Sequence, residues 1–161
     1  MKFITGFYKV QNKAKYRGNK DNIVYRSGWE RRAFLFFDNS PYIKEWSSEE
    51  LIIPYFGVDG KIHRYFPDVT FTNQKGERFV VEIKPKKQTK KPRKSKSEKK
   101  YLTESLTYVT NQLKWEAAIK FCLERKSFFL ILTEDQINPI FSDKKILENL
   151  EMKINETKLS K

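Results

Sequence analysis

The chain has 161 residues, enough for a single domain over residues 1–161. Its 33 Lys and Arg against 20 Asp and Glu give a net charge of +13. This charge favours an anionic partner, either nucleic acid or an anionic membrane surface. One Cys and one His exclude an internal disulfide, a cysteine-rich zinc site and a multi-histidine metal site. No apolar run approaches the roughly 20 residues of a membrane span and no signal-peptide stretch opens the chain, so we expect a soluble, cytosolic protein without a membrane partner.

The first predicted elements are an irregular arm and a helix. Residues 1–24 are basic and polar, with scattered Phe and Tyr and no clear period, so we expect a basic N-terminal arm that becomes ordered only on a partner. Ser27 is a predicted N-cap, and the apolar residues that follow recur at helical spacing as far as Phe37. The Asp-Asn-Ser-Pro sequence of residues 38–41 ends this helix.

Three strands follow, connected as a meander. Residues 43–56 read as an extended segment, and residues 58–60 (Val-Asp-Gly) are a hairpin turn signal. Residues 61–72 form a second strand rich in β-branched and aromatic side chains, and the polar residues 73–77 form a turn. Residues 78–84 are the third predicted strand.

The next segment is cationic and precedes a long helix. Between Lys86 and Lys100 there are nine Lys or Arg residues against one acid, Glu98, so residues 85–100 are predicted to form a basic loop. Residues 101–126 read as a helix. Its expected buried stripe consists of Leu102, Leu106, Val109, Leu113, Ala117 and Phe121.

The end of the chain completes the predicted fold. Residues 127–133 are a fourth strand. The remainder, from residue 134, reads as a short helix and a charged tail, with residues 138–161 as a charged C-terminal extension. The order of helix, three-strand meander, helix and strand predicts an α/β sandwich around a mixed four-stranded sheet. The last helix–strand step places the fourth strand parallel to the third.

The end of the third strand carries an acid and a base. Because side chains alternate along a strand, Glu82 and Lys84 lie on one face and Ile83 on the core face. Asp68 lies on the preceding strand after Pro67, which cannot donate a ladder hydrogen bond, so that strand is expected at an edge or distorted there. Neighbouring strands lie about 5 Å apart, which brings Asp68 beside Glu82. Two carboxylates this close favour a shared cation, and a hard divalent ion such as Mg²⁺ suits oxygen ligands.

A third acid, Glu30, falls on the inward stripe of the first helix. Such an acid is costly unless it meets a cation, so we expect it to complete an acidic cluster. The plainer alternative is an ion pair with Arg26 one turn back. Glu82 and Lys84 have a similar alternative, a surface ion pair worth less than about 1 kcal/mol.

These motifs resemble a known superfamily. Pro67-Asp68 and Glu82-Ile83-Lys84 look like the PD-(D/E)XK signature of restriction-endonuclease-like nucleases, whose common core has the same order of elements. From about residue 22 to residue 133 the chain is similar to the head-completion nucleases of T-even-type bacteriophages, and more weakly to transposon-end-cutting nucleases. The resemblance implies a small metal-dependent DNA nuclease that acts late in head maturation.

The resemblance also implies roles for single residues. Lys84 would be the catalytic lysine, and Gln112 would orient Lys84 or the attacking water unless it only caps a polar patch. Mg²⁺ would be the cofactor, with Mn²⁺ able to substitute. The implied metal ligands are Asp68, Glu82, the carbonyl of Ile83, and Glu30 directly or through water.

The remaining basic residues suit a DNA backbone. An arginine fork binds phosphate with two hydrogen bonds, and flexible ammonium groups displace condensed counterions. The basic loop has no aromatic residue before Tyr101, so we expect little sequence preference from it; alternatively it is only a solvated tether. The predicted DNA-binding residues are Arg26, His63, Arg64, Lys86, Lys87, Lys90, Lys91, Arg93, Lys94, Lys96 and Lys114.

Two functions follow from this reading. The first is a metal-dependent DNA endonuclease that acts on DNA ends or on branched or flapped DNA in the host cytoplasm or at the virion head–neck region, with head–neck or portal proteins as partners. The second is a non-catalytic structural DNA-binding protein of the head–neck junction. The acidic residues favour the first function, because in a purely structural protein carboxylates that face the DNA polyanion would only weaken DNA binding. An RNA-associated basic protein is a third reading, which the lack of an RNA-binding aromatic motif disfavours.

Overall fold

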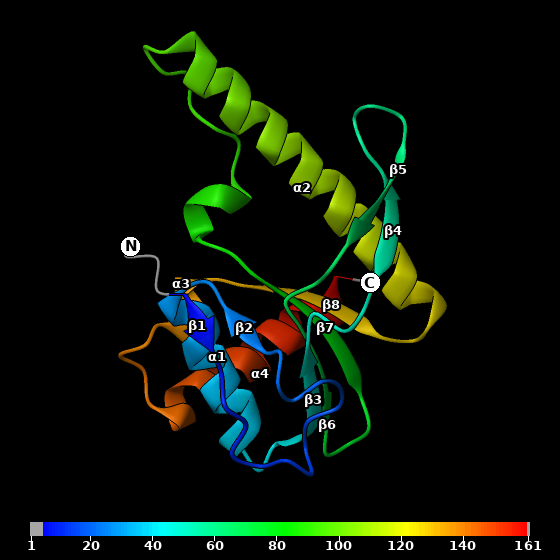
Figure 1. The fold of residues 1–161 in the computed structure, drawn as a ribbon, viewed down its shortest axis with the longest axis vertical. Helices are drawn as coiled ribbons and strands as arrows, with labels where there is room; N and C mark the ends of the chain where they lie inside the picture. Colours follow the sequence, from blue (N-terminus) through cyan, green and yellow to red (C-terminus); the bar gives the residue numbers. More distant parts are fainter. Residues whose placement is uncertain (1–4, 161) are drawn as a thin grey trace.

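A mixed four-stranded sheet forms the centre of the protein, whose computed structural model describes residues 5–160 (Figure 1). The strands are β3 (Ile43–Ser48), β6 (Val69–Asn73), β7 (Arg78–Ile83) and β8 (Phe128–Leu132), in the order β3-β6-β7-β8. The first three pair antiparallel, and β8 runs parallel to β7. The predicted meander and the parallel return of the last strand are both confirmed.

Helices cover both faces of this sheet. On one face, α1 (Gly28–Asn39), α3 (Glu134–Ile137) and α4 (Asp143–Leu159) enclose the larger core. On the other face, α2 (Glu98–Glu124) packs through Trp115 and its neighbours. Strand β7 supplies side chains to both cores, as its period of two requires. Phe79, Val81 and Ile83 belong to the larger core and Val80 to the smaller one. The predicted α/β sandwich is confirmed.

Helix α1 begins and ends where the sequence predicts. The side chain of Ser27 caps it by accepting a hydrogen bond from the backbone amide of Glu30 at 3.1 Å. Near the other end, the buried side chain of Asp38 accepts hydrogen bonds from the Tyr8 hydroxyl at 2.7 Å and from the backbone amide of Gln11 at 2.8 Å. These bonds tie the N-terminal segment to the helix, because a buried carboxylate needs such donors.

The N-terminal segment is therefore part of the fold, and the prediction that residues 1–24 order only on a partner is wrong. Strand β1 (Gly6–Phe7) pairs with β2 (Val24–Tyr25). The segment contributes buried side chains to the larger core: Tyr8, Val10, Tyr16 and Ile23. The sequence shows no period here because the segment packs as irregular chain. Residues 1–4, the start of the predicted arm, lie outside the described residues.

Two predicted strands are each broken in two. The predicted turn at residues 58–60 does form a hairpin, but its strands β4 (Ile53–Phe56) and β5 (Ile62–Tyr65) pair only with each other and project from the sheet (Figure 1). The chain leaves β3 through Glu49, a non-glycine residue at φ 54°. It returns through Pro67, where the missing amide ends the ladder. The predicted distortion at Pro67 is confirmed, but β6 is an inner strand, not an edge.

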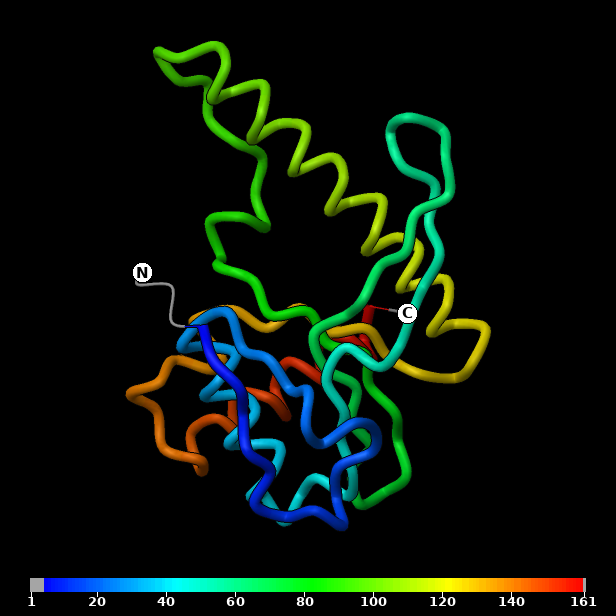
Figure 2. The backbone as a smooth tube through the Cα atoms, viewed as in Figure 1, coloured from blue at the N-terminus to red at the C-terminus, as the bar shows by residue number. Residues whose placement is uncertain are grey.

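Helix α2 begins three residues earlier and ends two residues earlier than predicted, and it buries another face. A 3₁₀ turn, η1 (Lys86–Thr89), opens the basic segment, and Ser97 caps α2 by accepting a hydrogen bond from the amide of Lys100. The predicted loop 85–100 therefore ends at residue 97. The first half of α2 extends past the sheet (Figure 2), so the predicted stripe has little core to meet. Leu102, Leu106 and Val109 are 67%, 55% and 44% exposed. The buried residues are Asn111, Trp115, Ala118 and Cys122.

The C-terminal extension is a core element, contrary to the predicted charged tail of residues 138–161. Helix α4 buries Ile146, Leu150 and Ile154 at steps of four residues against β8 and the larger core. The many charges around these three residues obscured the stripe. None of the helices within residues 5–160 has the length and apolar character needed to cross a membrane.

Candidate functional site

Two carboxyl side chains meet where β6 and β7 lie side by side. Asp68 directly precedes β6, and Glu82 is the second-to-last residue of β7. The amide of Ile83 donates a hydrogen bond to Asp68 Oδ2 at 2.7 Å, and the pairing of Val69 with Val81 sets Asp68 beside Glu82 on the neighbouring strand. The predicted juxtaposition of Asp68 and Glu82 is confirmed. Ile83 points into the larger core, as predicted.

Two aromatic side chains orient Glu82 on the α2 face of the sheet. The Tyr65 hydroxyl donates a hydrogen bond to Glu82 Oε2, and the Trp115 indole Nε1 donates another at 3.2 Å. Both residues lie in the smaller core, so Glu82 is buried with only 6% of its surface exposed. A buried Tyr or Trp normally finds such a partner for its polar atom. Glu82 is thus held by β5 and α2 as well as by its own strand.

The electrostatics of the pair favour a shared cation. Burial is the main cause that raises the pKa of Asp68 well above its usual value, followed by the charge and hydrogen bond of Glu82 and then the charge of Glu30. Two buried carboxyls this close are costly to charge together. A hard divalent ion would offset that cost, because it accepts carboxylate oxygens and completes its shell with water, phosphate or a backbone carbonyl.

A third carboxylate does not join the pair directly. No group of three or more acidic, His or Cys side chains in residues 5–160 is arranged to hold a metal ion. The expectation that Glu30, Asp68 and Glu82 converge as three side-chain ligands is therefore corrected. Glu30 Oε2 is engaged by the amide of Arg26 at 3.0 Å. Glu30 still acts on the pair through its charge, and burial raises its own pKa.

A cavity of about 550 Å³ lies beside the end of β7, and its lining includes neither Asp68 nor Glu82. Glu30, Ile83 and Lys84 all contribute to its wall, and Ile83 is the residue whose amide contacts Asp68. The cavity thus carries one acid and one lysine of the predicted site. Its complete lining is Thr5, Arg26, Ser27, Trp29, Glu30, Ile83, Lys84, Pro85 and Gln88.

Arg26 reaches the same region and is held there by an acid. Its guanidinium forms an ion pair with Glu49, the residue with left-handed backbone between β3 and β4. The hydrogen bond to Glu49 is the main cause that raises the pKa of Arg26. The alternative prediction, an ion pair between the side chains of Glu30 and Arg26, does not form. Arg26 contacts Glu30 through its backbone amide and pairs with Glu49 through its guanidinium. Arg26 keeps 55% of its side chain exposed.

Lys84 and Gln112 are less closely engaged. The Lys84 amide bonds to the carbonyl of Leu132 at 2.9 Å, and its half-buried side chain forms no ion pair within residues 5–160. A surface ion pair between Glu82 and Lys84 therefore does not form. Gln112 is half-buried on α2, and no hydrogen bond joins it to Lys84 in the described part of the chain. Its neighbour Asn111 instead lies on the buried face of α2, one turn before Trp115.

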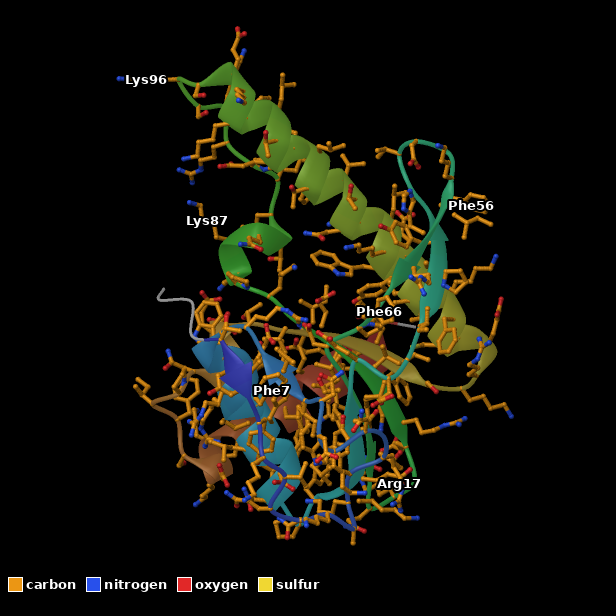
Figure 3. The ribbon with its side chains drawn as sticks, in the orientation of Figure 1. Phe7, Arg17, Phe56, Phe66, Lys87 and Lys96 are labelled. Carbon is orange, nitrogen blue, oxygen red and sulfur yellow. The ribbon has the colours of Figure 1, made fainter. Side chains whose placement is uncertain are left out.

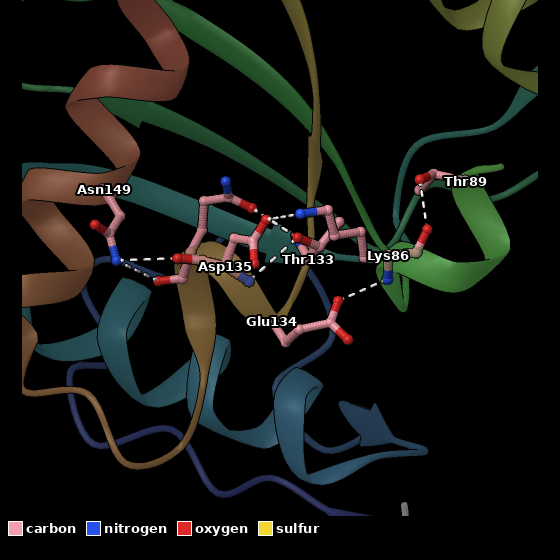
Figure 4. Close-up of polar contacts among 7 residues, drawn as sticks. Lys86, Thr89, Thr133, Glu134, Asp135 and Asn149 are labelled. Carbon is pink, nitrogen blue, oxygen red and sulfur yellow. Dashed lines mark hydrogen bonds and ion pairs between the residues drawn. The ribbon is translucent and has the colours of Figure 1, made fainter.

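The basic segment begins at the site and extends away from it (Figure 3). Lys86 is tied to α3: its amide donates to Glu134 at 2.6 Å and its ammonium pairs with Asp135 at 3.0 Å (Figure 4). The remaining predicted DNA-binding residues of the segment are exposed, and none forms an ion pair within residues 5–160. They are Lys87, Lys90, Lys91, Arg93, Lys94 and Lys96.

Three other predicted DNA-binding residues lie on or next to the β4–β5 hairpin: His63 and Arg64 on β5, and Lys114 on α2. His63 Nε2 lies 2.9 Å from Asp59 Oδ2 in an exposed pair. The Arg64 guanidinium lies over the ring of Phe66, 5.7 Å from its centroid. The Lys114 ammonium lies 5.8 Å from the centroid of the Tyr65 ring, beside the tyrosine that contacts Glu82.

Tyr65 and Trp115 are the functional residues that sequence reasoning missed. Tyr65 lies three residues before Asp68 on a strand whose break was not foreseen. Trp115 lies in the smaller core, where its indole donates to the acid. The available signal was chemical: a buried Tyr or Trp near an acidic cluster has a donor that requires an acceptor.

Comparison with known proteins identifies the family. Residues 40–134, more than half of the chain, match the TnsA-like endonuclease N-terminal family. The chain belongs to this endonuclease family. It is also 39% identical over 142 residues to the head completion nuclease of Enterobacteria phage T4, with 84% of this chain and 95% of that protein covered. No solved structure gives a significant match.

Membership of the TnsA-like family agrees with the fold. The matched residues begin at the end of α1 and include β3 to β8 with α2, so they contain Asp68, Glu82 and Lys84. The restriction-endonuclease-like architecture and the nuclease assignment expected from the sequence are confirmed. Among the predicted site residues, Arg26 and Glu30 lie outside the matched range.

Proposed function

We propose that this protein is a Mg²⁺-dependent DNA endonuclease of the PD-(D/E)XK type that acts in phage head completion. The observation that carries the proposal is the placement of Asp68 and Glu82 side by side on adjacent strands, where the amide of Ile83 bonds to Asp68. Glu82 lies two residues before Lys84, whose charge is unpaired within residues 5–160. The likeness to a head completion nuclease supports the biological setting. DNA is the substrate, and the host cytoplasm and the virion head–neck region are the proposed locations, with head–neck or portal proteins as partners.

The residues present fit a divalent ion at the carboxyl pair. Asp68 and Glu82 would hold it, with the carbonyl of Ile83 and a water-mediated contact from Glu30; Mn²⁺ would substitute for Mg²⁺. When bound, such an ion lowers the pKa of a coordinated water and stabilises charge on a phosphate.

The protein's own residues supply binding and orientation. Tyr65 and Trp115 keep the Glu82 carboxylate in one orientation and exclude water from its buried side. Lys84 lines the cavity, where its ammonium would neutralise charge on the reacting phosphate or hold the attacking water. Arg26, more than half exposed, would bind a neighbouring phosphate. Hydrolysis forms a bond between water oxygen and phosphorus and breaks the bond to the 3′ oxygen.

The decisive experiment separates cutting from binding. Wild type, Glu82→Gln and Lys84→Ala are compared on linear, flapped and branched DNA with Mg²⁺, and binding is measured in EDTA. Both variants are expected to bind DNA and to lose at least about a hundredfold in cleavage rate, the usual scale for acid–base and electrostatic groups. Lys44→Ala is the matched control, because Lys44 is an exposed lysine on β3.

Two results would decide against this proposal. Equal cleavage by wild type and both variants would remove the assigned residues from catalysis. Absence of any cleavage by wild type with Mg²⁺ or Mn²⁺, with DNA binding intact, would favour the structural DNA-binding role instead. Thermal unfolding of each variant establishes that loss of cutting is not loss of folding.

A further inference from the structure

The tip of the β4–β5 hairpin exposes an apolar group. Phe56 and Ile62 are cross-strand partners at the last position of the ladder, and each is 66% exposed. Val58, in the turn, is 57% exposed. Figure 3 shows the hairpin extending beyond the body of the protein with Phe56 directed outward. Single exposed apolar residues are ordinary, but a group at the end of a projecting element indicates contact with another molecule.

The base of the hairpin is fixed to the carboxyl pair. Ile53 and Tyr65 pair across the strands and are buried in the smaller core with Trp115, and Tyr65 bonds to Glu82. Strand β5 then continues through Phe66 and Pro67 into Asp68. The tip therefore has a defined position relative to the proposed metal ligands.

The turn itself is well ordered by its own hydrogen bonds. The amide of Gly57 donates to the carbonyl of Lys61 at 2.9 Å, and the amide of Gly60 donates to the carbonyl of Gly57 at 3.0 Å. Gly60 has φ +74°, a conformation that favours glycine. Such a turn presents Phe56 and Ile62 as a rigid edge.

The charge around the hairpin tip indicates which kind of molecule the tip contacts. Lys61 and Arg64 are exposed, Arg64 lies over Phe66, and the single acid of the hairpin, Asp59, is paired with His63. A second copy of the chain would bring its own +13 against this one, which disfavours self-association. DNA offers both anionic phosphates and flat apolar bases.

We propose that the hairpin tip inserts into the base stack of DNA beside the scissile phosphate. Apolar side chains such as Phe and Ile enter base steps and unstack them in other DNA-bending proteins. The favoured substrate is then DNA whose bases next to the cut are unpaired or easily unstacked, as at an end, a flap or a branch. This inference rests on the endonuclease function proposed above and names the DNA structure that it selects.

The test uses a double variant, Phe56→Ala/Ile62→Ala, whose side chains are exposed and add little to folding. Binding in EDTA is followed with a duplex that carries 2-aminopurine, whose fluorescence rises on unstacking. Wild type is expected to raise the signal and the double variant is not. Cleavage of fully paired duplex with Mg²⁺ should fall about tenfold, the scale of one lost base stack, and cleavage of a duplex with a short mismatch bubble should fall less.

Ile140→Ala is the matched control, because Ile140 is 85% exposed in the loop between α3 and α4; it should match wild type. Equal fluorescence and equal cutting by the double variant would overturn the inference and leave the nuclease proposal intact. If wild type cuts no DNA, the nuclease proposal fails, while the fluorescence still reports insertion. A wild-type dimer in sedimentation that the double variant abolishes would assign the tip to self-association instead.

Discussion

At the scale of single residues, the centre of the site is one carboxylate with two fixed donors. Tyr65 and Trp115 both donate to Glu82 Oε2 from outside β7. Donors of this kind restrict the orientation of a metal-ligating side chain and tune its basicity. In the proposed nuclease, the hairpin and α2 would influence the chemistry through their hydrogen bonds to Glu82, without ligating an ion themselves.

Tyr65→Phe should separate this orienting effect from folding. Removal of the hydroxyl is expected to reduce cleavage and raise the Mg²⁺ concentration needed for half-maximal rate by about tenfold each, as for other residues that support a metal ligand. The measurement is a Mg²⁺ titration of the cleavage rate. Tyr55→Phe on β4 is the control, since its hydroxyl makes no hydrogen bond within residues 5–160. Equal titrations for both variants would contradict this role.

Asp68→Asn should change how stability depends on pH. The pKa of Asp68 is raised in the folded state, so above roughly 4, the unfolded value, the folded protein binds more protons than the unfolded chain. The free energy of unfolding in EDTA must then fall as pH rises through the folded pKa.

The Asn variant keeps the shape without the charge. It should lack this fall and be more stable than wild type at neutral pH, with each unit of pKa shift worth about 1.4 kcal/mol. Urea unfolding over a pH series measures the difference. Parallel curves for the two proteins would show that Asp68 is not the group responsible.

Sequence reasoning predicted the carboxyl pair but not its surroundings. Strand alternation and a meander suffice to bring Asp68 beside Glu82, because they depend only on backbone geometry. The position of Glu30 depends on which donor its side chain finds, and Arg26 supplies its own amide. The engagement of Glu82 by Tyr65 required the break at Pro67, which turns β5 out of the sheet.

At the scale of elements, α4 shows why charge can hide a core helix. Lys, Glu and Asn surround its three buried residues, so composition indicated a solvated tail. The contacts of α4 with β8 and the larger core show that it is a core helix. Helix α2 shows the opposite error: its apolar stripe is regular, but half of the helix lies beyond the sheet, and the buried face contains Asn111 and Trp115 instead.

Leu150→Ala tests the role of α4. Leu150 is 1% exposed, so truncation should lower the free energy of unfolding by about 2–5 kcal/mol, the cost of a core cavity. Met152→Ala, two residues away and 63% exposed, should cost less than about 0.5 kcal/mol. Urea denaturation of both variants gives the comparison. Similar small losses would mean that α4 does not stabilise the fold.

At the scale of the whole molecule, positive charge is concentrated beside the site. The exposed lysines and arginine between η1 and α2 form no ion pairs within residues 5–160, whereas Lys86 is bound to α3. Such groups suit a DNA backbone without sequence preference. Glu49 is paired with the Arg26 guanidinium, which offsets its repulsion of a phosphate.

Neutralising the segment should change the salt dependence of binding. A variant with Lys87, Lys90, Lys91 and Lys94 replaced by Gln is expected to bind DNA more weakly in EDTA. The slope of log affinity against log salt should fall by about 0.9 for each lost phosphate contact with duplex DNA. Fluorescence anisotropy at several salt concentrations measures the slope. Gln at Lys144, Lys145 and Lys153 of α4 is the control, and an equal change there would show only a net-charge effect.

The parallel pairing of β7 with β8 has an evolutionary consequence. Residues 84–127 connect the end of β7 to the start of β8, its neighbour in the sheet. Lys86, near the start of this connection, forms an ion pair with Asp135, which follows β8. Insertions or deletions between residues 90 and 97 can therefore lengthen or shorten this excursion while the strand ends stay in place. Relatives could therefore differ in the length and charge of this segment while the ends of β7 and β8 keep their positions.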